Sequence, residues 1–267
     1  MTKPYGIIAD AHLHNWQAFA VMQSDGMNSR LTALLAEITR AAIALRKAGG
    51  DTLYIAGDVF HVRGSVAPSV LNPVIALIKK LVSLGIKIRI IAGNHDLEGK
   101  HSERLGSAVT ALEDVGALVC HLTGTFHEDK VIMIPWFDKL DDLRAQATKI
   151  NESGDFGDYD LIIHAPLNGV ITGLPDHGLS TAEIAQWGFK RVFAGHHHNH
   201  ADTGSGVYSI GAIAHHTWSD VGSKAGFVIV GDEVAHVESS LPKFIDVYPN
   251  MTEDEVAAIA PGNFLRA

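Results

Sequence analysis

Residues 86–96 read IKIRIIAGNHD and join an apolar run to a polar turn. The run Ile86–Ile91 is rich in β-branched residues, which is typical of a buried strand. It leads into Gly93-Asn94-His95-Asp96, where an amide, an imidazole and a carboxyl group follow one another. In open α/β sheets, ligands bind at the carboxyl ends of the strands. The stretch therefore predicts both a strand and a functional site at its end.

The same order of apolar run, polar loop and amphipathic helix continues on both sides of this stretch. Further strands are predicted at Tyr5–Ala9, Thr52–Ala56, Ala117–His121, Val131–Ile134, Leu161–Ile163 and Arg191–Ala194, with shorter ones at Val207–Ile210, Phe227–Val230 and Val234–Val237. The spacing of apolar residues predicts helices at Leu31–Leu45, Pro68–Leu84, Leu105–Val115 and Leu143–Ile150. This alternation with a β-rich end predicts a layered α/β or α+β sandwich.

The composition narrows the class of protein. The chain has 267 residues, a formal charge of −9 and 46% apolar residues, which excludes a disordered chain. A single cysteine, Cys120, excludes an internal disulfide framework and a cysteine-rich zinc site. No apolar run reaches the ~20 residues of a membrane helix and no signal-peptide pattern is present, so we expect a cytoplasmic protein without membrane contact. The negative charge argues against a broad electrostatic coating of nucleic acid.

Polar, metal-binding residue types follow five of the predicted strands. They are Asp10 and His12, Asp58, Asn94 and His95, His164, and His196 and His198. Carboxylate, imidazole and amide ligands without a thiolate suit manganese, iron or zinc. These ligands exceed what one ion uses, so we expect two divalent ions, manganese first and iron or zinc as alternatives. Asp58 is the best candidate for a carboxylate that bridges them.

The order of these motifs resembles a known family. Asp-x-His at Asp10 and His12, Gly-Asp at Asp58, Gly-Asn-His-Asp at Asn94, a lone His164 and Gly-His-x-His at His196 resemble the calcineurin-like metallophosphoesterases over residues 5–238. The resemblance implies two central mixed β-sheets flanked by helices. It also implies that one metal is held by Asp10, His12, Asp58 and His198, and the other by Asp58, Asn94, His164 and His196. His95 would then be free of metal and close to the substrate.

Two further stretches are similar to the SbcD-type nucleases, the nuclease subunits of double-strand break repair complexes. One runs from Gly57 to His61 and continues into Ala67-Pro68-Ser69, and the other spans residues 211–227. This resemblance implies a DNA exonuclease or endonuclease in which His61 orients the phosphodiester. It also implies single- or double-stranded DNA as substrate and an SbcC-type coiled-coil ATPase as a partner.

The sequence departs from that nuclease group near its end. SbcD-type proteins continue into a capping domain and an ATPase-binding segment, whereas this sequence ends at Ala267. We therefore expect a catalytic domain at residues 1–240 and a C-terminal extension at residues 241–267 without a complete capping domain. Cap-dependent substrate selection and the ATPase partnership depend on the segments that are missing from this sequence.

The expected mechanism is hydrolysis by a hydroxide that two cations share. His95 protonates the leaving alkoxide as a general acid. Asp96 either orients the imidazole of His95 or serves only to fix the turn. The same motifs are also compatible with a phosphatase, a small-molecule or cyclic-nucleotide phosphodiesterase, or a catalytically dead scaffold, which the complete ligand set disfavours.

Two of three smaller features leave two interpretations each. Lys100, His101 and Arg104 either meet a phosphate backbone at the mouth of the site or form a solvated loop. The apolar stripe on the helix Pro68–Leu84 indicates core packing more than a dimer face, and a homodimer is left open. His215 and His216 are expected to be structural.

Overall fold

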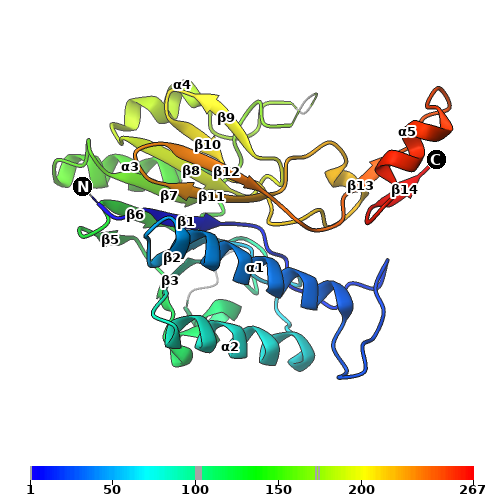
Figure 1. Ribbon diagram of the computed structural model, residues 1–267. Coiled ribbons are helices and arrows are strands. Elements are labelled where there is room, and N and C mark those ends of the chain that lie inside the picture. Colours follow the sequence, from blue (N-terminus) through cyan, green and yellow to red (C-terminus); the bar gives the residue numbers. More distant parts are fainter. Residues whose placement is uncertain (1, 100–103, 172, 174) are drawn as a thin grey trace.

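Two six-stranded sheets pack face to face in the computed structural model, which describes residues 2–99, 104–171, 173 and 175–267 (Figure 1). The first sheet has the order β12 (Val234–Glu238), β11 (Gly226–Val230), β1 (Tyr5–Ile8), β2 (Thr52–Ala56), β3 (Lys87–Ile91) and β4 (Leu118–Cys120). The second has the order β5 (Gly124–Phe126), β6 (Val131–Ile134), β7 (Asp160–His164), β8 (Arg191–Gly195), β10 (Val207–Ser209) and β9 (Ala201–Gly204). Both sheets mix parallel and antiparallel pairs.

Three apolar clusters hold the layers together. One fills the space between the sheets, where Ile7, Ala56 and Ile162 lie fully buried beside Phe193. Another lies between the first sheet and the helices α1 (Ser29–Lys47) and α2 (Pro68–Ser83). The third lies between the second sheet and the helices α3 (Leu140–Ser153) and α4 (Thr181–Ile184). The result is a helix–sheet–sheet–helix sandwich, and the predicted fold class is confirmed.

Local signals explain the two helices of the first layer. The side chain of Asn28 caps α1 by accepting hydrogen bonds from the backbone N–H groups of Arg30 and Leu31. Pro68 occupies the first turn of α2, where its missing N–H group costs little. The stripe on α2 is buried in the core, as its pattern indicates, at Val70, Val74, Ile78 and Leu81.

The predicted helix Leu105–Val115 is wrong in type. The chain forms two 3₁₀ segments there, η1 (Arg104–Gly106) and η2 (Ala108–Val115). A 3₁₀ helix rises ~2.0 Å per residue against ~1.5 Å in an α-helix, so it covers a longer path with the same residues. The backbone N–H of Ala108 is also tied to the carbonyl of Asp96, which fixes where the second segment begins.

The carboxyl ends of the parallel strands of both sheets meet at one end of the sandwich. Strands β1 to β4 run parallel in the first sheet, and β6, β7, β8 and β10 run parallel in the second. His164 at the end of β7 donates to the carbonyl of Ala56 at the end of β2 across 2.7 Å. The backbone N–H of Trp136, just after β6, donates to the carbonyl of Ala92, just after β3, at 3.0 Å.

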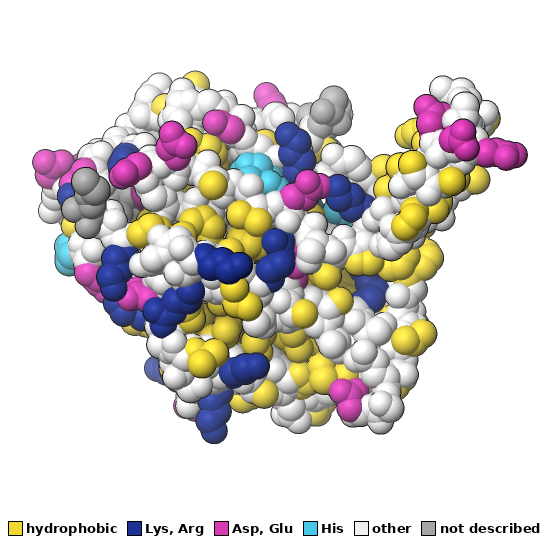
Figure 2. Space-filling view, in the orientation of Figure 1, with side chains coloured by type: hydrophobic (Ala, Val, Ile, Leu, Met, Phe, Trp, Pro, Cys, Tyr) yellow, Lys and Arg dark blue, Asp and Glu magenta, His cyan; other side chains and the backbone are white. Residues whose placement is uncertain are grey.

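Residues 241–267 contain three short elements, the strands β13 (Phe244–Asp246) and β14 (Phe264–Arg266) and the helix α5 (Glu253–Ile259). The two strands pair in parallel, and the unit projects from the sandwich (Figure 1). Phe244 and Phe264 attach it through ring contacts with Phe19. Figure 2 shows the acidic first turn of α5 at the tip of this projection. No helix in the described part of the chain is long and apolar enough to span a membrane.

Candidate metal centre

All seven predicted metal ligands come together at the carboxyl ends of the strands. Asp10 and His12 follow β1, Asp58 follows β2, Asn94 follows β3, His164 ends β7, and His196 and His198 follow β8. The sequence separates the first and last of them by nearly two hundred positions, whereas the topology places them at one edge.

The ligands fall into two groups with Asp58 between them. In one group, Nε2 of His12 lies 3.2 Å from Nε2 of His198. In the other, Oδ1 of Asn94 lies 3.2 Å from Nε2 of His164 and 3.1 Å from Nδ1 of His196. Oδ2 of Asp58 is 3.7 Å from Nε2 of His12 and 3.4 Å from Nε2 of His164. Asp58 therefore has the position of a bridging carboxylate.

Hydrogen bonds on the far side of two imidazoles determine which ring nitrogens face the centre as acceptors. Nδ1 of His198 donates to Asp220, and Nδ1 of His164 donates to the carbonyl of Ala56. In the neutral imidazole the Nε2 atom then carries a lone pair. In the second group that lone pair faces oxygen atoms of Asp58 and Asn94, which are acceptors too. Converging lone pairs repel one another unless a proton or a metal ion lies between them, so the donor set fits divalent metal ions, which would take the place of the proton on His164.

The shifted pKa values of the buried side chains also indicate a site for positive charge. Asp10, Asp58 and His164 are almost fully buried. Burial raises the pKa of Asp10 to about 6. The charge of Asp58, acting against the effect of burial, raises the pKa of His164 to about 9, and the pKa of Asp58 itself is lowered below its usual range. The centre therefore favours a positive charge, which metal ions would supply.

Four of the ligands have an unusual backbone conformation. Asp10, His12, Asp58 and His196 have φ values of 49°, 41°, 52° and 101°, which L-residues rarely adopt. Such strain persists only where the surrounding structure enforces it, and it is typical of functional sites. The backbone of Gly93 packs directly on one of these residues, because a Cβ at position 93 would lie 2.2 Å from Oδ1 of Asp58.

The two predicted catalytic histidines lie beside the ligands. The backbone N–H of His95 donates to Oδ1 of Asp58 at 2.8 Å, and its Nδ1 donates to the carbonyl of His61 at 2.6 Å. Among the described residues, Nε2 of His95 has no hydrogen-bond partner. The rings of His61 and His95 are stacked with centroids 5.6 Å apart, and Nδ1 of His61 lies 3.4 Å from Nδ1 of His12.

Asp96 does not contact the imidazole of His95. Its buried carboxylate accepts backbone N–H groups of Gly93 at 2.9 Å, Phe60 at 2.9 Å and Val59 at 3.3 Å. Of the two roles considered for Asp96, the hydrogen bonds match the fixing of the turn. The orienting bond that was expected from Asp96 comes instead from the carbonyl of His61.

Sequence reasoning missed two residues of the centre. Oδ1 of Asp220 accepts from Nδ1 of His198 at 2.7 Å. Nε2 of His216 donates to the backbone carbonyl of Asp10 at 2.8 Å, and its ring contacts those of His12 and His198. Thr217 and Asp220 form a capping box at the short helix η4 (Trp218–Asp220), and nothing in this local pattern points to His198.

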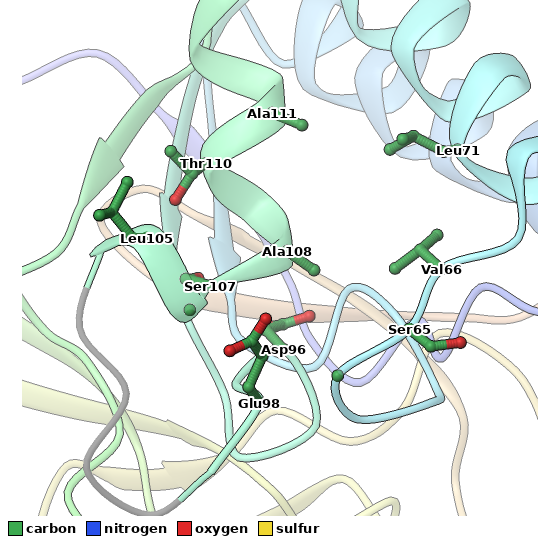
Figure 3. Close-up of a pocket in the computed structure, with 12 residues that line it drawn as sticks. Ser65, Val66, Leu71, Asp96, Glu98, Leu105, Ser107, Ala108, Thr110 and Ala111 are labelled. Carbon is green, nitrogen blue, oxygen red and sulfur yellow. The ribbon is translucent and has the colours of Figure 1, made fainter.

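One cleft borders the histidine cluster, and a second hollow is lined by Asp96 but by none of the histidines. A polar cleft of about 530 Å³ is lined by His196, His198 and the loop Ser219–Ser223. The other, of about 370 Å³, lies between the loops that follow His61 and His95 and the 3₁₀ segments (Figure 3). Among the residues predicted to meet a phosphate backbone, Arg104 pairs with Glu113, while Lys100 and His101 lie outside the described residues.

Comparison with known proteins agrees with this geometry. Residues 3–200 match the family of calcineurin-like phosphoesterases. The chain belongs to this family. Membership makes it a hydrolase of phosphoric ester bonds that works with divalent metal ions, although the comparison does not identify the metal.

Of two similar solved structures, the first supports the fold. A dimetal phosphatase from Danio rerio is similar over 85% of this chain and 92% of its own, with a TM-score of 0.51 and 10% identity. The nuclease MPE from Pseudomonas putida aligns over 87% of both chains, with a TM-score of 0.38 and 16% identity. No curated protein matches the sequence. At these identities the likeness concerns the fold and leaves the substrate open.

Proposed function

We propose that this phosphoesterase is a phosphodiesterase that uses two divalent metal ions, manganese by preference, to cleave DNA as an exonuclease or endonuclease. The observation that carries the proposal is the convergence of seven ligand side chains in two groups around Asp58, with His95 tied to the same carboxylate. Asp10, His12, Asp58 and His198 hold one ion. Asp58, Asn94, His164 and His196 hold the other.

His95 is the general acid of the proposed reaction. When bound, the two ions supply an activated water and neutralise charge on the phosphate. The bond from Nδ1 of His95 to the carbonyl of His61 fixes the ring and leaves Nε2 to carry the transferred proton. Nε2 donates this proton to the leaving oxygen, which would otherwise depart as an alkoxide.

His61 favours a diester over a monoester. Its ring stacks on that of His95 and its Nδ1 lies beside His12, so it is within reach of a phosphate bound at the centre. The polar cleft lined by His196 and His198 leaves room for chain on one side of a scissile phosphate, while His61 lies on the side of His12 and His95. A phosphate monoester has a substituent on one side alone. The role of His61 in the proposed reaction is therefore to orient the phosphodiester.

One observation favours the alternative, a phosphatase or small-molecule or cyclic-nucleotide phosphodiesterase. No Lys or Arg is among the described residues that line the cleft beside His196. Arg46, Lys47 and Lys80 lie in the last turns of α1 and α2, at the opposite end of the strands, and Figure 2 shows basic side chains over that helical face. DNA binding should then be weak and sensitive to salt, because few phosphates are neutralised.

The deciding experiment is cleavage of end-labelled single- and double-stranded DNA with manganese, beside bis-aryl and mono-aryl phosphate esters. The proposal expects DNA cleavage that disappears with a chelator and in His95→Ala. Hydrolysis of the esters without DNA cleavage would contradict the nuclease assignment and support the alternative.

Four sequence-based expectations stay predictions. They are the preference for manganese over iron or zinc, a cytoplasmic location, an SbcC-type ATPase partner, and a homodimer. Activity after reconstitution with each metal tests the first, and light scattering of the purified chain tests the last.

A further inference from the structure

The imidazoles of the centre differ in what orients them. A metal-binding histidine ordinarily donates its second ring N–H to a carboxylate or carbonyl, which fixes the plane of the ring. His164 has the carbonyl of Ala56 at 2.7 Å, and His198 has the carboxylate of Asp220 at 2.7 Å. A hydrogen bond from the second ring nitrogen therefore fixes the plane of both imidazoles.

His196 has no such partner among the described residues. Its Nδ1 faces Oδ1 of Asn94 at 3.1 Å, on the side of the centre, and its Nε2 forms no hydrogen bond within the described part of the chain. Its backbone is also the most unusual of the ligands, with φ at 101°. Three rings contact the imidazole of His196. Those of His164 and His197 are edge-on or tilted, with centroids at 5.4 and 5.2 Å, and the indole of Trp136 is stacked on it, with centroids 5.4 Å apart and planes 19° apart.

The position of Trp136 is not explained by core packing. Its side chain belongs to none of the three apolar clusters of the described residues. Its ring contacts are with His196 and, edge on, with His164 at 5.9 Å. Pro135 follows the end of β6 and directly precedes Trp136. The backbone N–H of Trp136 donates to the carbonyl of Ala92 and so anchors Trp136 across the two sheets. The chain therefore holds the indole of Trp136 in a fixed position against the imidazole of His196.

We propose that Trp136 is a positioning residue for the second metal ion: its indole stacks on His196 and holds the imidazole with Nδ1 aimed at the ion. The stack takes the place of the hydrogen bond that orients His164 and His198. This inference rests on the metal roles assigned above and extends them to a residue outside the ligand set. It does not depend on whether the substrate is DNA.

The test is manganese binding to the metal-free protein, measured by calorimetry in a double-mutant cycle. Trp136→Ala should lower the affinity for the second ion by about 10-fold, which is the lower end of the loss expected when an orienting partner is removed. In the His196→Ala background the same substitution should change the remaining affinity by less than about 2-fold, because a residue that acts through His196 is silent without it. Trp136→Phe, which keeps an aromatic plate, should restore most of the affinity.

Asp220→Ala is the matched control, since Asp220 orients His198 and should weaken binding in the His196→Ala background as well. Wild-type affinity in a folded Trp136→Ala would overturn the proposal. An equal loss with and without His196, or no rescue by phenylalanine, would overturn it too, because Trp136 would then act on the fold. The readout is metal binding, so failure to cleave DNA would refute the proposed substrate and leave this inference standing.

Discussion

The buried carboxylates at the two ends of the strands differ in the partners they have. At the amino ends, Tyr5 donates to Asp160 at 2.6 Å, and Arg191 binds the same carboxylate through two hydrogen bonds of 2.6 and 2.8 Å. Arg89 and Tyr54 do the same for Asp129 at 2.6 and 2.8 Å. Each buried carboxylate there has a cation and a hydroxyl group as partners. At the carboxyl ends, the carboxylates meet imidazoles and an amide oxygen whose lone pairs converge.

This difference shows how one sandwich separates stability from function. The amino ends are complete within the protein, and they tie the first sheet to the second through Tyr5 and Asp160. The carboxyl ends bring together groups that could hold metal ions, and they carry strained backbone at Asp10, Asp58 and His196. Substitutions at the two ends should therefore fail in different ways, in stability at one and in metal binding and catalysis at the other.

The largest effect is expected from Asp58→Ala. It removes the carboxylate that lies between both ligand groups and the acceptor that holds the backbone of His95. We expect hydrolysis of every substrate to fall by about 1,000-fold or more. Steady-state kinetics with saturating manganese measures this, and a variant that keeps a tenth of the activity would show that Asp58 does not bridge two ions.

His95→Ala should come next and should depend on the leaving group. A general acid contributes ~10²–10⁴-fold when it protonates an alkoxide, but an aryl oxide of low pKa leaves without a proton. We therefore expect DNA cleavage to fall by at least about 100-fold while bis-(4-nitrophenyl) phosphate is hydrolysed at nearly the wild-type rate. Equal losses on both substrates would contradict the assignment of the proton transfer to His95.

At the other end of the strands, Asp160→Ala should affect stability alone. It leaves Arg191 and Tyr5 without their buried partner, and breaking a buried ion pair costs ~3–5 kcal/mol of the free energy of unfolding. Urea denaturation should show that loss, with manganese affinity unchanged. If Asp160→Ala instead lost metal with little change in unfolding, the separation between the two ends would not hold.

The smallest effect is expected from Asp220→Asn. The amide keeps the shape of Asp220 and its oxygen can still accept from Nδ1 of His198, but it loses the negative charge that makes this imidazole a stronger ligand. Its NH2 group then faces the backbone N–H groups of His216 and Thr217, which adds a cost in stability. We expect an affinity loss of about 10-fold for one manganese ion, without a change in the other. Calorimetric titration measures both ions, and an unchanged titration would exclude a role for Asp220 in metal binding.

The sequence predicts most of this architecture because its strands are buried apolar runs. Thr52–Ala56 and Val131–Ile134 have the predicted boundaries, and the ligands are visible as polar residues directly after such runs. Strands such as β5 and β9 carry no apolar alternation and are recognised only by their pairing partners. The strands β13 and β14 likewise pair residues about twenty positions apart, such as Phe244 with Phe264.

The site is predicted less completely than the fold, for physical reasons. Ligand identity follows from residue type, but orientation follows from contacts made at long range, such as those of Asp220 and Trp136. The hydrogen bond that orients His95 is accepted by the backbone carbonyl of His61. Every residue has a backbone carbonyl, so the residue types in the sequence cannot reveal such a bond. Positive φ at Asp10 and Asp58 is equally invisible, because the surrounding fold imposes it.

An anomalous difference map from crystals grown with manganese tests whether the site is a dinuclear centre bridged by Asp58. The lone pairs described here predict two manganese peaks, one between Asp10, His12 and His198 and one between Asn94, His164 and His196, with Asp58 bound to both. A single peak, or two peaks that do not share Asp58, would contradict the claim that the carboxyl ends of the strands form one dinuclear centre.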